Sequence, residues 1–132
     1  MTETLRLSTT LPAAPEQVYW AWLSSEEHGL FTGSPAEVDP RVEGRFTAWD
    51  GYIQGKTLAL EPYGRILQSW RTTDFPAESP DSLLEVLIRP DEQGAVVELI
   101  HTEIPDGQGE EYRQGWEEYY LAPMREYFAG KS

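Results

Sequence analysis

In the first third of the chain, the spacing of hydrophobic residues changes from every second residue to the spacing of a helix. Residues 4–11 alternate apolar and polar side chains, which predicts a β-strand with one buried face. In residues 15–23, Val18, Ala21 and Trp22 share one stripe at helical spacing, and Pro15 suits the first turn of a helix. The capping-box pattern at residues 24–27 then predicts a second short helix, which Gly29 and Gly33 close.

The middle of the chain returns to a period of two. Asp50-Gly51 is a strong hairpin signal, and other short turns containing Pro or Gly separate the remaining apolar runs. Residues 74–81 hold two prolines and indicate an irregular loop. Strands joined by tight turns favour an antiparallel meander. The expected strands are residues 36–38, 45–49, 52–61, 65–72, 82–89 and 95–103.

The last quarter predicts a long helix over residues 110–128. Its aromatic face is too apolar for water and must lie against the sheet. Pro123 should kink this helix, or the helix ends near Ala122 and restarts. The order predicts an α+β helix-grip fold in a single domain, residues 1–132, with a curved antiparallel sheet around the C-terminal helix and two short helices after the first strand. Such layers often enclose a cavity.

Several ordered motifs resemble one known family. The run GRFTAWDGYIQG at residues 44–55 resembles the homologues of the activator of heat-shock protein 90 ATPase, within the START-like or SRPBCC superfamily. Residues 61–71, His101 with Ile104-Pro105, and residues 113–120 are similar to later motifs of that family, so the resemblance covers residues 11–128. It implies the same helix-grip fold. In the eukaryotic co-chaperone the corresponding domain is C-terminal and a separate N-terminal domain does much of the chaperone binding, so we do not expect ATPase activation from this chain.

The net charge disfavours some classes of binding partner. The 132 residues include 23 acidic and 10 basic side chains, a net charge of −13. This charge repels phosphate backbones and anionic lipids, so we expect no nucleic acid and no membrane as partner. A cationic partner or a neutral ligand remains open, as does a role in solubility alone. The chain has no cysteine, no signal-peptide pattern and no membrane-length apolar run, which favours a cytoplasmic protein.

The two histidines are the first candidates for chemistry. His28 follows two glutamates and is expected to be exposed; the alternative is a general base or metal ligand. His101 shares the parity of Val97 and Leu99 and is expected to face the cavity, where it could hydrogen-bond a ligand; the alternative is a structural histidine. Neither metal nor cofactor motifs are present, and no nucleophile motif is seen.

Two mid-strand carboxylates are weaker candidates. Glu85 and Glu98 would have raised pKa values if they pointed inward, but outward, solvated positions are expected. Arg45 and Arg71 could pair with them across strands.

Aromatic residues provide the main site hypothesis, since they make up 12% of the chain. Tyr and Trp combine an apolar body with one polar group, which suits an amphipathic ligand. The alternative is a packed core without a cavity. The expected ligand-binding residues are Phe31, Phe46, Trp49, Tyr52, Trp70, His101, Trp116, Tyr119 and Tyr120.

Three functions follow in order of preference. The first is a non-enzymatic domain that binds a small hydrophobic or amphipathic ligand between sheet and C-terminal helix. The second, implied by the resemblance, is a stress protein that interacts with a chaperone. The third is an enzyme of the cyclase or hydrolase kind that the superfamily includes. Monomer and homodimer both remain open.

Overall fold

The computed structural model describes the backbone of residues 2–131 and the side chains of residues 2–130. Within these residues seven strands form one sheet in the order β1-β7-β6-β5-β4-β3-β2, and every neighbouring pair is antiparallel. The strands are β1 (Thr2–Leu11), β2 (Glu37–Val38), β3 (Arg45–Ala48), β4 (Ile53–Glu61), β5 (Arg65–Thr72), β6 (Ser82–Asp91) and β7 (Gly94–Pro105).

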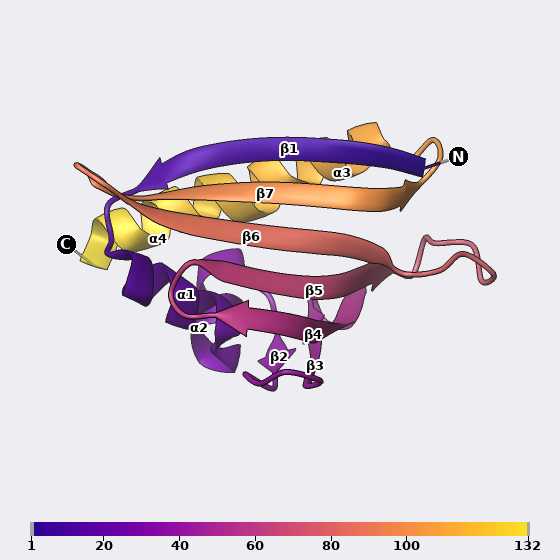
Figure 1. Ribbon diagram of the computed structural model, residues 1–132, viewed down its shortest axis with the longest axis horizontal. Coiled ribbons are helices and arrows are strands. Elements are labelled where there is room, and N and C mark those ends of the chain that lie inside the picture. Colours follow the sequence, from indigo (N-terminus) through magenta and orange to yellow (C-terminus); the bar gives the residue numbers. More distant parts are fainter. Residues whose placement is uncertain (1, 132) are drawn as a thin grey trace.

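The helices cover one face of this curved sheet. Helices α1 (Pro15–Leu23) and α2 (Ser25–Thr32) lie between β1 and β2 in the chain, and α3 (Gly109–Trp116), η1 (Glu117–Leu121) and α4 (Ala122–Lys131) follow β7. Figure 1 shows the C-terminal helix, in yellow, running behind β1, β7 and β6. Helix α1 contacts β6 and β7, while α2 contacts α4. This is the helix-grip arrangement that the residue pattern predicted.

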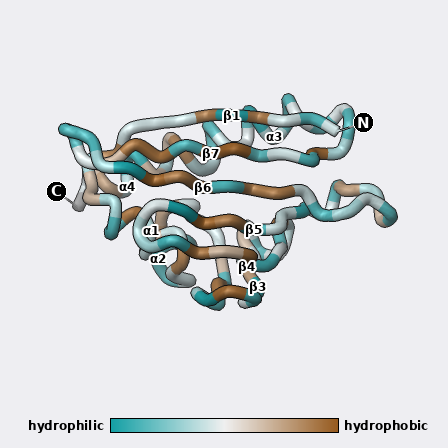
Figure 2. Tube along the Cα trace, in the orientation of Figure 1, coloured by the Kyte–Doolittle hydropathy of each residue, from teal (hydrophilic) through white to brown (hydrophobic). Residues whose placement is uncertain are grey.

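Alternation along the strands builds the core. In β5, and in β6 as far as Ile88, buried and half-buried residues alternate position by position, and the hydropathy colouring changes along the same strands (Figure 2). The register places Ile66 opposite Val86 and Trp70 opposite Ser82 on the buried face. The buried face also carries polar side chains, and their hydrogen bonds shape the site described below.

The turn after β3 places two aromatic residues at its ends. The Tyr52 amide donates to the Trp49 carbonyl over 3.2 Å, and Asp50 and Gly51 have φ values of 56° and 91°, as a type I′ hairpin turn requires. Trp49 itself has a φ of 53°, which is uncommon for a bulky residue. Strand β4 therefore begins at Ile53, one residue later than predicted, and Tyr52 belongs to the turn.

Glu3 anchors the start of the C-terminal helix to β1. Its carboxylate accepts hydrogen bonds from the backbone N–H groups of Gly107, over 3.0 Å, and Gly109, over 2.6 Å. These backbone donors favour the ionised form and lower the pKa of Glu3. The turn after β7 is thereby held beside the first strand.

Pro123 changes the helix locally without ending it. The backbone is helical from residue 109 to residue 131, so the alternative of a helix that stops near Ala122 and restarts is wrong. Pro123 has no N–H to donate. The five residues of η1 form a π-helical stretch just before it, in which the Ala122 N–H donates to the Glu117 carbonyl. Two adjacent tyrosines of this stretch lie in different environments: Tyr120 is buried, and Tyr119 is 52% exposed.

Candidate ligand pocket

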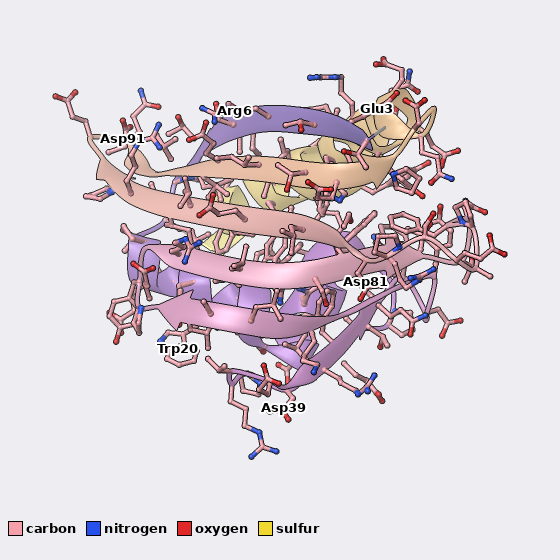
Figure 3. The ribbon with its side chains drawn as sticks, turned by 45° about the vertical axis from the view of Figure 1, so that its right-hand side comes forward. Glu3, Arg6, Trp20, Asp39, Asp81 and Asp91 are labelled. Carbon is pink, nitrogen blue, oxygen red and sulfur yellow. The ribbon has the colours of Figure 1, made fainter. Side chains whose placement is uncertain are left out.

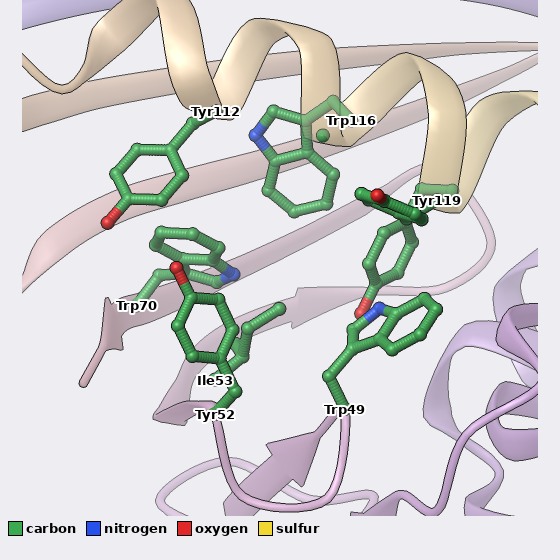
Figure 4. A pocket seen from close by; sticks show the side chains of 9 residues that line it. Trp49, Tyr52, Ile53, Trp70, Tyr112, Trp116 and Tyr119 are labelled. Atoms are coloured by element: carbon green, nitrogen blue, oxygen red, sulfur yellow. The ribbon is translucent and has the colours of Figure 1, made fainter. Parts of the chain in front are cut away.

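A pocket of about 380 Å³ opens between the C-terminal helix and the β3–β4 turn (Figure 4). Seven of its nine lining residues are aromatic, and none of the nine carries a charge. The walls therefore favour apolar or weakly polar molecules. The lining residues are Trp49, Tyr52, Ile53, Trp70, Tyr112, Gly115, Trp116, Tyr119 and Tyr120.

The pocket has a buried floor and an exposed mouth. Trp70 from β5 and Trp116 from α3 are each 3% exposed, and their ring centroids lie 5.5 Å apart. At the mouth, the Trp49 and Tyr119 rings meet edge to face with centroids 5.2 Å apart. A ligand would enter beside the half-buried Trp49 and the exposed Tyr119 and reach the two buried indoles.

Six of the nine residues predicted for the site line the pocket: Trp49, Tyr52, Trp70, Trp116, Tyr119 and Tyr120. Tyr112, Gly115 and Ile53 also line it and were not predicted. Tyr112 lies on the same aromatic helix face, four residues before Trp116, so its spacing was an available signal. Gly115 has no side chain, and no pattern could have indicated it.

Two predicted phenylalanines lie in the core, outside the lining. Phe46 pairs with Gly55 across β3 and β4, and a Cβ added at Gly55 would lie 2.7 Å from the Phe46 ring. The ring of Phe46 therefore covers this glycine. Phe31 packs against His28 with ring centroids 4.8 Å apart.

His101 points inward from β7 and lies behind the pocket wall rather than in its lining. It is 0% exposed. The Trp116 indole N–H donates to its Nδ1 over 3.0 Å, and its Nε2 lies 2.8 Å from the Ser82 hydroxyl, which in turn donates to the Trp70 carbonyl. This chain of bonds requires the proton on Nε2. Burial lowers the pKa of His101 to about 3. Both ring nitrogens are thus engaged: Nδ1 positions Trp116, and Nε2 is held by Ser82.

The expectation of an exposed His28 was wrong. The ring is 2% exposed; Nδ1 donates to the Trp22 carbonyl over 2.9 Å, and Nε2 lies 2.8 Å from the Tyr120 hydroxyl. Burial lowers the pKa of His28 to about 4, so the ring is neutral at pH 7 and its Nε2 accepts a hydrogen bond from the Tyr120 hydroxyl. The physical reason is that α2 packs against the C-terminal helix. His28, Phe31 and Thr32 share one buried face at i, i+3, i+4 spacing, a signal that the sequence contained.

The strand carboxylates have other partners than predicted. Glu85 and Glu98 are half-buried on the outer face. Arg71 binds Asp81 over 2.8 Å, and Arg45 is exposed, so neither pairs with them. The observed pairs join Arg65 to Glu85 over 2.5 Å, and Arg6 and Arg89 to Glu98 over 3.5 and 3.6 Å.

Acidic side chains outnumber basic ones by 23 to 10. Figure 3 shows Asp39, Asp81 and Asp91 projecting around the rim of the sheet. Among residues 2–131, no three His, Asp or Glu side chains are grouped closely enough to hold a metal ion. Within the same residues, every helix is too short or too polar to cross a membrane.

Comparison with known proteins identifies relatives over nearly the whole chain. The family model described as "Activator of Hsp90 ATPase homolog 1-like protein" matches residues 12–129. The chain is 26% identical over 132 residues to the Activator of 90 kDa heat shock protein ATPase homolog of Dictyostelium discoideum, covering 99% of this chain and 34% of that protein. It is 27% identical over 125 residues to the human Activator of 90 kDa heat shock protein ATPase homolog 1, covering 94% and 36%.

The chain thus spans about a third of the length of these curated relatives. A solved structure shares its fold over a similar range. The crystal structure of an HSP90 activator from Plasmodium falciparum superimposes with a TM-score of 0.80 at 24% identity, covering 92% of this chain and 91% of that one.

Proposed function

This chain belongs to the family of Activator of Hsp90 ATPase homolog 1-like proteins, and from that premise we propose that it is a single non-enzymatic binding domain for a small hydrophobic or amphipathic ligand. The ligand occupies the pocket between the sheet and the C-terminal helix. One observation carries this proposal: an uncharged, mostly aromatic pocket of about 380 Å³ opens to solvent at one end. Its volume lies within the range of small-molecule sites, and burial of apolar surface supplies affinity at about 25 cal/mol per Å².

The hydrogen bonds behind the pocket support a preformed site. Trp116 is held by His101, and Tyr120 by His28, so two wall residues are fixed from behind. A wall that is ordered before binding loses little conformational entropy when the ligand enters.

The same bonds support a non-enzymatic role. A general base needs a nitrogen or oxygen that can reach the substrate. His28 and His101 have both ring nitrogens bonded within the protein, and both have lowered pKa values. The half-buried Glu85 and Glu98 are on the outer face, away from the pocket.

Native mass spectrometry of the freshly purified protein tests ligand binding. A bound mass of small-molecule size, absent from the denatured spectrum, is expected. Gly115→Leu should abolish it, because Gly115 lines the pocket and its added side chain would extend into it. Gly130→Leu is the matched control: Gly130 lies in the same helix outside the pocket, with nothing within 4 Å of an added Cβ. Equal ligand occupancy in both variants would contradict the proposal.

A chaperone partner is the second candidate. It is supported by the names of the relatives, which are activators of the 90 kDa heat shock protein ATPase, and by the net charge of −13, which suits a basic surface. Purified Hsp90 should then capture the chain at about 0.02 M salt and lose it at about 0.5 M, where charges are screened within a few ångströms. Absence of capture at low salt would remove this candidate. Stimulation of the ATPase should be measured in the same samples.

A further inference from the structure

One tryptophan of the pocket, although its side chain is largely buried, has an indole N–H without a protein partner. Trp22, Trp70 and Trp116 are 2–3% exposed. The Trp22 indole N–H donates to the side chain of Gln68 over 3.1 Å, and that of Trp116 donates to His101 over 3.0 Å. Within the part of the chain that the structure describes, the Trp70 indole N–H makes no hydrogen bond; because no fully buried side-chain nitrogen or oxygen there lacks a partner, this N–H must be accessible from the pocket that Trp70 lines. Figure 4 shows this nitrogen turned toward the pocket interior. Buried indole N–H groups normally have an acceptor, so this donor is available to a ligand.

Three of the four tyrosine hydroxyls among the lining residues already have hydrogen-bond partners. Tyr52 donates to the Asp74 carboxylate over 2.6 Å, and Tyr112 donates to the Gln108 side chain over 2.7 Å. The Tyr120 hydroxyl is bonded to His28. Among the buried side chains that line the pocket, the Trp70 N–H is therefore the donor left for a ligand, whereas Trp49 and Tyr119 lie at the mouth.

Charge excludes two ligand classes. An anion or a cation would lose its hydration in a pocket whose nine lining residues include no charged side chain. The net charge of −13 further repels anions. Aromatic faces can hold a cation, but the Trp70 N–H is the positive edge of its ring and points inward.

We propose that the pocket selects a neutral, planar aromatic compound whose carbonyl-type oxygen accepts a hydrogen bond from Trp70 Nε1. This inference rests on the proposed ligand-binding function and narrows it to one chemical class. Ring stacking on the walls supplies most of the affinity, and the hydrogen bond sets the orientation of the ligand. Compounds of the same shape that lack the acceptor bind more weakly.

A set of three matched probes tests this proposal. 9-Fluorenone, fluorene and fluorene-9-carboxylate share one ring skeleton and differ in having a carbonyl, no acceptor and a charged group. Isothermal titration calorimetry should show fluorenone binding about three- to tenfold more tightly than fluorene, as one net hydrogen bond predicts. The carboxylate should bind more weakly than either. Carboxylate binding as tight as that of fluorenone would overturn the proposal.

Trp70→Phe removes the donor and keeps an aromatic ring. It should lower the affinity for fluorenone about three- to tenfold and change that for fluorene less than twofold. Trp20→Phe is the control, because Trp20 is 45% exposed and does not line the pocket. It should change neither affinity. Since Trp70→Phe can also disturb folding, the indole N–H resonance of Trp70 in the wild-type protein gives an independent readout. Fluorenone should shift it downfield as a hydrogen bond forms, and fluorene should not.

The outcomes separate this inference from the proposed function. Equal affinities for fluorenone and fluorene, both abolished by Gly115→Leu, would overturn the Trp70 proposal and leave the ligand pocket standing. Binding of neither probe, together with a clean apo mass in native mass spectrometry, would overturn both.

Discussion

The aromatic face of the C-terminal helix has two ends that use the same residue types differently. At one end Trp22, His28, Phe31 and Tyr120 form what we call the sealed cluster. Its rings pack closely, with centroids 5.3 Å apart for Trp22 and Tyr120, and each ring N–H and hydroxyl has a partner. At the other end, the pocket leaves space and an indole N–H without a protein partner, that of Trp70. Aromatic content is therefore no guide to a site; unfilled volume and unused hydrogen bonds are.

Tyr120 joins the two ends. Its ring lines the pocket, while its hydroxyl donates to His28 in the sealed cluster. The order of the sealed cluster should therefore determine the rigidity of the pocket wall.

Lowering the pH should cause the largest loss of stability, because both buried histidines are neutral in the folded protein. In the unfolded chain they take up protons near pH 6.5, whereas burial lowers the folded pKa values to about 4 for His28 and about 3 for His101. The unfolded state therefore binds more protons as pH falls, and stability is lost between about pH 6.5 and pH 4. Each histidine should account for about 3 kcal/mol over that range. Urea denaturation at pH 7, 5.5 and 4 measures this loss.

His28→Gln separates the histidine contribution from that of the carboxylates. The variant should be less stable at pH 7. Between pH 6 and pH 4.5 its free energy of unfolding should fall less steeply than that of the wild type, and the two slopes should differ by about 1.4 kcal/mol per pH unit. Identical slopes for the variant and the wild type would show that His28 does not resist protonation in the folded state.

Two adjacent tyrosines give a matched test of the sealed cluster. Tyr120→Phe removes the proton donated to His28 and leaves a buried acceptor unsatisfied, at a cost of about 1–3 kcal/mol. Tyr119→Phe changes an exposed side chain at the pocket mouth and should cost less than about 0.5 kcal/mol. Thermal denaturation of both variants measures the stability that each loses. Equal losses would contradict the division into a sealed and an open end.

The fold could be predicted because its signals are local. Alternation in residues 65–72 and the helical spacing of Tyr112, Trp116 and Tyr120 are visible within a few residues, and they determine which faces are buried. The site could be predicted only in part, because pairing is not local. The partner of Trp22 lies 46 residues away, and that of His28 lies 92 residues away. No pattern near Trp70 distinguishes its free N–H from the bonded N–H of the other two indoles.

The glycine at position 115 leaves space in the pocket and should lower the stability of the C-terminal helix. Glycine within a helix is less stable than alanine by about 0.5–1 kcal/mol. A Cβ added at Gly115 would have the Tyr119 ring at 3.9 Å as its nearest neighbour, an ordinary contact. Gly115→Ala should therefore stabilise the protein by about 0.5–1 kcal/mol in urea denaturation. A loss of stability would mean that the pocket is already filled at this point.

The smallest effect concerns a single proton on each histidine, and it tests the hydrogen-bond directions directly. His28 Nδ1 faces a carbonyl oxygen, which can only accept, so Nδ1 carries the proton. His101 Nδ1 faces the Trp116 N–H, which can only donate, so the proton lies on Nε2. Long-range ¹H–¹⁵N spectra of the imidazoles at pH 7 should therefore show opposite tautomers. The same tautomer in both rings would mean that one network is reversed. If it were His101, Trp116 would lose the acceptor that fixes the pocket floor, and its indole N–H would join that of Trp70 as a free donor.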